Sequence, residues 1–128
     1  MSLPPAENGA AALVTGASSG IGEALARQLA ERGYRVGLVA RNEAKLRALA
    51  DETGGEVFVC DLADADARDR LASEIAERGL QVEVLVNNAG FGVYKDFAES
   101  DREREIEQAR VNVEAVVDLT HRFLPAMV

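Results

Sequence analysis

The stretch that decides the fold is Thr15-Gly16-Ala17-Ser18-Ser19-Gly20-Ile21-Gly22, which closes the apolar run Ala11–Thr15 and leads into a helical pattern. The apolar run predicts a strand, and the apolar spacing after the turn predicts a helix from Ile21 to Arg32. Glycine lets the chain turn sharply and lets a pyrophosphate approach the backbone. A helix start adds free N–H groups and a positive dipole end, and Ser18 and Ser19 can add hydroxyl donors. The stretch therefore predicts a phosphate-binding turn, and a plain glycine-rich turn is the alternative.

Strand and helix patterns alternate from this turn onward. The expected strands are Ala11–Thr15, Arg35–Ala40, Glu56–Cys60 and Val82–Val86, and the expected helices run from Ile21 to Arg32, from Asn42 to Thr53, from Asp64 to Gly79, and from the capping box Ser100–Glu103 to Pro125. The strands are apolar on both faces, which is typical of a parallel sheet between two helical layers. We therefore expect a doubly wound α/β domain over residues 10–128, with right-handed crossovers, after a flexible lead-in at residues 1–9.

The composition excludes several classes of protein. The chain has 128 residues, enough for one domain, and a net charge of −8, which argues against a nucleic-acid partner. Its apolar runs are too short to span a membrane. One cysteine, Cys60, excludes an internal disulfide and fits a cytoplasmic protein, and with one histidine, His121, we expect no metal site.

Several motifs, in order and at consistent offsets, resemble the signatures of the short-chain dehydrogenase/reductase family. The glycine pattern of residues 15–22 is similar to the first signature, and Asn87-Asn88-Ala89-Gly90 to the second. Asp61-Leu62 is similar to the adenine-contacting pair, and Asn112 matches an asparagine of the catalytic set. The resemblance covers residues from Ala11 to the end and points to the non-extended branch. It implies a partial Rossmann-type sheet in the strand order 3-2-1-4.

The resemblance also implies roles for individual residues. The residues expected to contact a dinucleotide are Gly16, Ser18, Ser19, Gly20, Ile21, Gly22, Arg41, Asp61, Leu62, Asn87, Ala89 and Gly90. Asn88 is expected to lock the fourth strand to the first, with Thr15 as its hydrogen-bond partner. Asp61 could instead merely cap the following helix.

Asn112 lies on the apolar stripe of the last expected helix. That stripe consists of Ile106, Ala109, Val113, Val116/Val117, Thr120 and Leu124. A polar side chain there is costly unless it is hydrogen-bonded, so a satisfied buried amide is one interpretation. The resemblance implies another, in which the asparagine disturbs its helix and holds a water on a proton relay.

The choice of dinucleotide depends on the end of the second strand. Enzymes that prefer NAD usually carry an acidic residue there, which accepts from the ribose 2′-hydroxyl. Ala40 occupies that position and cannot accept, and the next residue, Arg41, is always cationic and suits a 2′-phosphate. We therefore expect NADP(H) to be favoured over NAD(H); a solvated surface arginine is the alternative.

The rest of the family's active site is a serine followed by Tyr-x-x-x-Lys. Neither Tyr34 nor Tyr94 has a lysine four positions later, and the last serine is Ser100. The family's chains are also about twice this length. The printed sequence is thus either part of a longer protein or a piece that assembles with another copy. We expect the 128 residues alone not to catalyse hydride transfer.

Three functions remain open at this point. The first is an NADP-dependent oxidoreductase acting on an alcohol or carbonyl compound, represented by its cofactor-binding half. The second is a dinucleotide-binding module without chemistry. The third is a self-associating piece, because the fourth strand would form a bare sheet edge and Val113, Val117 and Leu124 would be uncovered. We expect a homo-oligomer.

Overall fold

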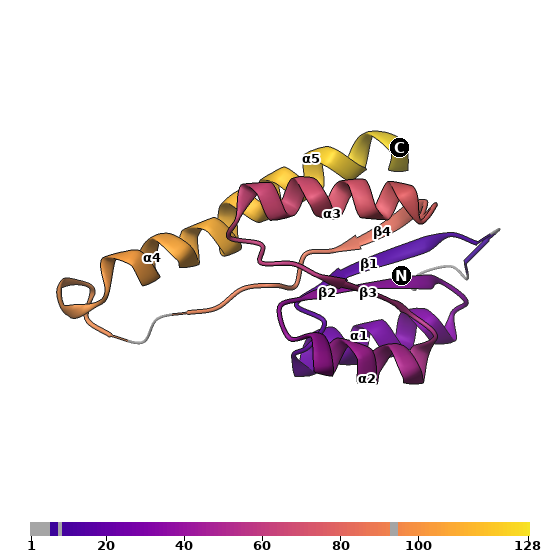
Figure 1. Cartoon of the computed structure of the whole chain (residues 1–128), viewed down its shortest axis with the longest axis horizontal. Coiled ribbons are helices and arrows are strands. Elements are labelled where there is room, and N and C mark those ends of the chain that lie inside the picture. Colours follow the sequence, from indigo (N-terminus) through magenta and orange to yellow (C-terminus); the bar gives the residue numbers. More distant parts are fainter. Residues whose placement is uncertain (1–5, 8, 93–94) are drawn as a thin grey trace.

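The fold is known from a computed structural model that describes residues 6–7, 9–92 and 95–128. Its elements are β1 (Ala11–Thr15), α1 (Gly20–Glu31), β2 (Arg35–Ala40), α2 (Glu43–Thr53), β3 (Glu56–Val59), α3 (Ala65–Glu77), β4 (Val82–Val86), the 3-10 turn η1 (Phe97–Glu99), α4 (Arg102–Ala109), the π-helical turn η2 (Arg110–Glu114) and α5 (Ala115–Met127). The strands are parallel in the order β3-β2-β1-β4. Helices α1 and α2 cover one face of the sheet, and α3 and α5 cover the other (Figure 1). The expected Rossmann-type α/β fold is confirmed.

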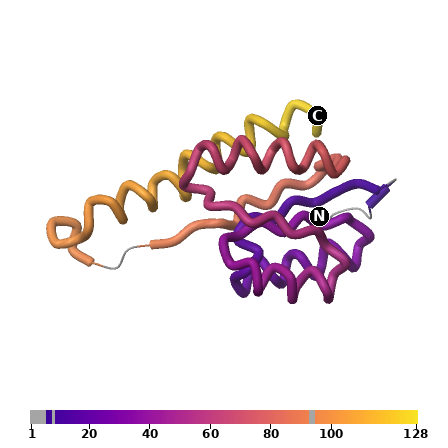
Figure 2. Tube along the Cα trace, in the orientation of Figure 1, coloured from indigo at the N-terminus to yellow at the C-terminus, as the bar shows by residue number. Residues whose placement is uncertain are grey.

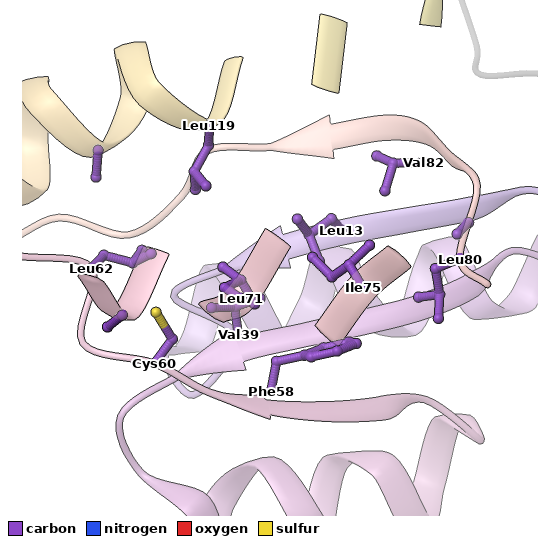
Figure 3. Packing of buried hydrophobic residues seen from close by; sticks show 13 residues of the cluster. Leu13, Val39, Phe58, Cys60, Leu62, Leu71, Ile75, Leu80, Val82 and Leu119 are labelled. Carbon is purple, nitrogen blue, oxygen red and sulfur yellow. The ribbon is translucent and has the colours of Figure 1, made fainter. Parts of the chain in front are cut away.

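Two apolar clusters, one on each face of the sheet, hold the layers together. On the α3–α5 face, Leu13 and Phe58 point from the strands toward Leu71 and Ile75 of α3, and Leu119 of α5 joins them (Figure 3). All five side chains are at least 98% buried. Because the four strands are parallel, all four carboxyl ends lie at one edge of the sheet, which is where the candidate site forms.

The last helix differs from the expectation at both ends. The predicted Ser100–Glu103 capping box is wrong, because Asp101 is the N-cap and its carboxylate accepts from the N–H of Glu103 at 3.0 Å. The Ser100 hydroxyl instead donates to the carbonyl of Phe97 at 2.9 Å, which closes η1. The predicted end at Pro125 is also wrong, since α5 continues to Met127. A proline so near the end of a helix removes only one backbone hydrogen bond, and the packing of α5 compensates for this loss.

The buried face of α5 is not the expected apolar stripe. Ala115 and Leu119 are buried, and Phe123 and Met127 pack against the same cluster. Val113, Val117 and Leu124 are exposed, as expected for that part of the stripe. The π turn η2 shifts the helical phase between α4 and α5, so one straight stripe cannot describe both. The path from α4 to α5 is nevertheless continuous, and α4 extends past the sheet edge (Figure 2).

Most of the predicted lead-in at residues 1–9 lies outside the described residues. Of its described part, Ala6 donates its N–H to the carbonyl of Arg32 at 3.0 Å. Within the described ranges, no helix has the length and apolarity needed to cross a membrane. The same ranges contain no group of three or more histidine, cysteine, aspartate or glutamate side chains that could hold a metal ion.

Candidate functional site

A cleft of about 480 Å³ opens at the carboxyl ends of the strands. It lies where the chain leaves β1 for one side of the sheet and β4 for the other, the position at which open parallel sheets bind ligands. Its lining comes from five segments that the fold brings together: Gly16, Ser18, Ser19; Ala40, Arg41, Asn42; Cys60, Asp61, Leu62; Asn88, Ala89, Gly90, Phe91; and Arg104, Glu107, Val111.

The glycine turn forms one wall of this cleft. Gly16 has φ +64°, and a Cβ on it would lie 2.9 Å from the backbone of Ala89. A Cβ on Gly22 would lie 2.2 Å from the carbonyl oxygen of Gly16, whereas one on Gly20 would meet nothing within 4 Å. Gly16 and Gly22 therefore serve the packing of the turn, and Gly20 leaves open space at the start of α1.

The start of α1 offers backbone donors beside that open space. The first helical hydrogen bond runs from the N–H of Glu23 to the carbonyl of Ser19, at 2.8 Å. The N–H groups of Gly20, Ile21 and Gly22 precede it, as at the start of any helix. Such groups, together with the helix dipole, attract anions. The turn can thus hold a phosphate chain.

Thr15 fastens the turn to the segment after β4. Its hydroxyl oxygen accepts from the N–H groups of Asn88 and Ala89, each at 3.0 Å, and its proton is directed to the carbonyl of Val86 at 3.3 Å. The side-chain amide of Asn88 donates to the carbonyl of Gly16 at 3.2 Å. These contacts confirm the predicted structural pairing of Thr15 with Asn88. They also fix the two loops that flank the cleft.

The opposite wall carries charged side chains. Arg41 follows β2, and its Nη1 lies 3.6 Å from Oε1 of Glu107 on α4. Nη1 of Arg104 lies 3.3 Å from the same carboxylate, and the Arg104 guanidinium lies 4.2 Å from the ring centroid of Phe91. The sequence analysis missed Glu107 and Arg104. No local pattern marks them, because they reach the cleft only where α4 passes the end of the sheet.

The floor of the cleft is formed by the segment after β3. Asp61 lines the cleft, and α3 is capped by Asp64, whose carboxylate accepts from the N–H of Asp66 at 3.0 Å. The alternative that Asp61 is the helix cap is therefore wrong. Asp61 accepts instead from the N–H of Ala63, at 3.0 Å. Cys60 also lines the cleft, and burial, followed by the charge of Asp61, raises the pKa of its thiol to about 11.

A buried arginine that the sequence analysis did not single out holds this floor in place. Arg68 is 2% exposed. It donates to the carbonyl of Leu62 and to the carboxylates of Glu114 and Asp118, each at 2.6 Å. Desolvation favours a lower pKa for Arg68, but its hydrogen bonds to both carboxylates, with their charges, outweigh desolvation and raise that pKa. Arg68 thus connects the floor of the cleft to η2 and α5.

The structure separates the residues expected to contact a dinucleotide into three sets. Eight lie on the cleft lining: Gly16, Ser18, Ser19, Arg41, Asp61, Leu62, Ala89 and Gly90. Gly20, Ile21 and Gly22 lie at the start of α1, next to Ser19. Asn87 is not one of the lining residues, and its Nδ2 donates to the hydroxyl of Thr120 at 3.1 Å.

Asn112 lies in the π turn η2, so its helix is disturbed there as the resemblance implied. Its amide is exposed rather than buried, and it bonds to both backbone groups of Phe91. The amide is therefore hydrogen-bonded, as the interpretation of a satisfied buried amide required. That interpretation is wrong about burial. Of the two tyrosines, Tyr34 is buried just before β2, and Tyr94 lies outside the described residues.

Comparison with known proteins gives consistent matches over nearly the whole chain. The family model for short chain dehydrogenase matches residues 10–128. A fatty acyl-CoA reductase from Acinetobacter baylyi is 39% identical over 127 residues, which cover 94% of this chain and 43% of that protein. Oxidoreductase UcpA from Salmonella typhimurium is 37% identical over 128 residues, covering 94% of this chain and 47% of that protein.

Solved structures match equally well. A metagenomic short-chain oxidoreductase in complex with NADP has a TM-score of 0.84 and 41% identity, over 93% of this chain and 57% of its own. L-Sorbose reductase from Gluconobacter frateurii, complexed with NADPH and L-sorbose, has a TM-score of 0.84 and 31% identity, over 99% of this chain and 50% of its own. The chain therefore spans about half the length of the proteins that it matches.

Proposed function

Since the chain belongs to the short-chain dehydrogenase family, we propose that its cleft binds NADP(H) in preference to NAD(H) in an oxidoreductase that acts on an alcohol or carbonyl compound. The single observation that carries the cofactor preference is Arg41 on the cleft lining directly after Ala40. A guanidinium attracts a 2′-phosphate, and alanine leaves no carboxylate to repel it. The complexes of the two similar structures with NADP and NADPH support the same choice.

The residues of the cleft fit such a dinucleotide. The open space at Gly20 beside the start of α1 suits the pyrophosphate, and the hydroxyls of Ser18 and Ser19 add polar groups to the same wall. Asp61 has a carboxylate that can accept from the adenine amino group, and the backbone of Leu62 is held next to it by Arg68. Ala89 and Gly90 add little bulk to the cleft lining, which leaves room for the cofactor ribose. Each of these residues binds or positions the ligand.

Nicotinamide, when bound, exchanges a hydride with the substrate carbon in this family's reaction. The contribution of the present residues would be to orient the cofactor, and that of Asn112 to hold η2 against Phe91 on the cleft lining. General acid–base catalysis would fall to the Tyr-x-x-x-Lys pair, which the printed sequence lacks. The second candidate is a module that binds the dinucleotide without chemistry, which the residues that line the cleft would suit equally well. For the oxidoreductase, we also propose a cytoplasmic homo-oligomer.

Calorimetric titration of the full-length protein with NADP⁺ and NAD⁺ tests the cofactor preference. Arg41→Gln should weaken NADP⁺ binding about 10- to 100-fold, the equivalent of one charged hydrogen-bonded pair, and should barely change NAD⁺ binding. Ala40→Asp should reverse the preference. Arg47→Gln is the matched control, because this exposed arginine pairs with Glu43 away from the cleft. Equal affinities of the unmutated protein for both dinucleotides would contradict the proposal.

Consumption of NADPH with a panel of carbonyl compounds separates the two candidate functions. An oxidoreductase turns over steadily with at least one compound. A binding module takes up NADPH and shows no turnover with any of them.

A further inference from the structure

Glu107 places a negative charge where two cations border the cleft. Its Oε1 lies 3.6 Å from Nη1 of Arg41 and 3.3 Å from Nη1 of Arg104. All three side chains line the same cleft. Glu107 is 31% exposed, less than Arg41 at 63% and Arg104 at 47%, so the carboxylate is the least solvated member of the three.

The position of the carboxylate opposes the binding of an anion to Arg41. A guanidinium that already faces a carboxylate is partly neutralised, and a phosphate that approaches it meets the charge of Glu107. A phosphate monoester carries about −1.5 to −2 charges at neutral pH, so the repulsion is larger for a 2′-phosphate than for a neutral hydroxyl. The charge of Glu107 therefore weakens the binding of NADP(H) and hardly affects the binding of NAD(H).

Arg104 offers the carboxylate a second partner. The Arg104 guanidinium is held above the ring of Phe91 at 4.2 Å, which restricts its position next to Glu107. Glu107 can therefore keep one ion pair when Arg41 turns to a phosphate. Separation of Arg41 from Glu107 then costs only the weaker and longer of the two contacts.

We propose that Glu107 is a specificity-determining residue, which competes with the 2′-phosphate of NADP(H) for Arg41 and so lowers the preference for NADP(H) over NAD(H). The inference rests on the proposed function, because it assumes that the dinucleotide lies in this cleft with its 2′-phosphate at Arg41. It adds that the preference set by Arg41 is held below its maximum by a residue 66 positions later in the chain.

The test is titration of the full-length protein and its variants with NADP⁺ and NAD⁺ at low ionic strength. Glu107→Gln should tighten NADP⁺ binding about two- to five-fold, the size of an exposed ion pair, and leave the Kd for NAD⁺ unchanged. Glu105→Gln is the matched control. It makes the same charge change on the same helix, and within the described part of the chain Glu105 has no ion pair with Arg41 or Arg104. This control should change neither Kd.

Two further measurements link the effect to Arg41. In an Arg41→Gln background, Glu107→Gln should tighten NADP⁺ binding less than it does when Arg41 is present, because only the direct repulsion of the phosphate remains. Between about 20 mM and about 500 mM salt, the gain from Glu107→Gln should shrink, because screening weakens interactions between exposed charges. Equal tightening for both dinucleotides, a gain that is just as large without Arg41, or weaker NADP⁺ binding would each overturn the inference.

The outcomes also separate this inference from the proposed function. If the unmutated protein prefers NADP⁺ and Glu107→Gln changes nothing, only the role of Glu107 is lost. If the unmutated protein binds neither dinucleotide, or binds both equally, the proposed function fails first, and the role of Glu107 fails with it.

Discussion

Asn112 and Phe91 are joined by two hydrogen bonds, although 21 residues separate them in the chain. The side-chain oxygen of Asn112 accepts from the N–H of Phe91 at 3.0 Å, and its Nδ2 donates to the carbonyl of Phe91 at 2.8 Å. Gly90 makes this approach possible, since a Cβ there would lie 2.9 Å from the Asn112 oxygen. One amide thus replaces a strand partner for the segment that leaves β4 and ties it to η2.

Replacing this amide should loosen the segment next to the cleft. We expect Asn112→Ala to lower the free energy of unfolding by about 1–2 kcal/mol, because two backbone groups lose their partner at an exposed position where water can replace it. Urea denaturation followed by circular dichroism measures the change. Asn87→Ala, which removes a single bond to Thr120, is the control and should cost less than about 1 kcal/mol. Equal losses of unfolding free energy in the two variants would show that the two bonds to Phe91 stabilise the fold no more than the single bond of Asn87.

Two glycines of the same turn should respond in opposite ways to the same substitution. Gly22→Ala should destabilise the fold by about 1–3 kcal/mol, because the new Cβ would lie 2.2 Å from the Gly16 carbonyl. Gly20→Ala should leave the free energy of unfolding unchanged or slightly raised, since nothing lies within 4 Å and alanine favours a helix. It should nevertheless weaken binding of NADP⁺, because its methyl group enters the space proposed for the pyrophosphate. Unchanged binding in Gly20→Ala would place the pyrophosphate elsewhere.

The buried guanidinium of Arg68 should make stability depend on acid pH. Burial favours a higher pKa for Asp118, but hydrogen bonds from Arg68 and Arg122, with their charges, outweigh it and hold that pKa below its ordinary value of 3.8. The unfolded chain therefore takes up a proton more readily than the folded one. The contribution of Asp118 is complete above pH 3.8 and is lost as pH falls through the lower pKa of the folded state.

Arg68→Met tests this coupling. We expect a loss of about 2–4 kcal/mol at neutral pH, since Leu62, Glu114 and Asp118 lose a buried partner. The further decline between about pH 5 and about pH 2 should be smaller than in the unmutated protein, because the pKa of Asp118 would lie closer to its ordinary value. Urea titrations at several pH values give both quantities. Arg47→Met, at an exposed arginine, should preserve the full acid dependence.

Local patterns in the sequence determined the elements, and the resemblance to a known family supplied the order of the strands. The glycine turn at residues 15–22, the glycines after the helices and the apolar runs each act within a few residues, so they can be interpreted without knowing the fold. Parallel strands and short connections then leave few topologies, and the order β3-β2-β1-β4 is one of them. The resemblance also assigned Gly16, Arg41 and Asp61 to one binding site, and all three line the cleft.

Only the tertiary structure decided which side chains meet there. The contact of Glu107 with Arg41 depends on where α4 passes the sheet, and that path depends on the π turn η2 and on the packing of Leu119. The three bonds of Arg68 likewise join segments 6 to 50 residues apart. A helical pattern repeats every 3.6 residues and fixes a face, but the neighbour of that face is set by the packing of the whole chain. The composition of the candidate cleft could therefore be predicted in part, whereas its charge pairs could not.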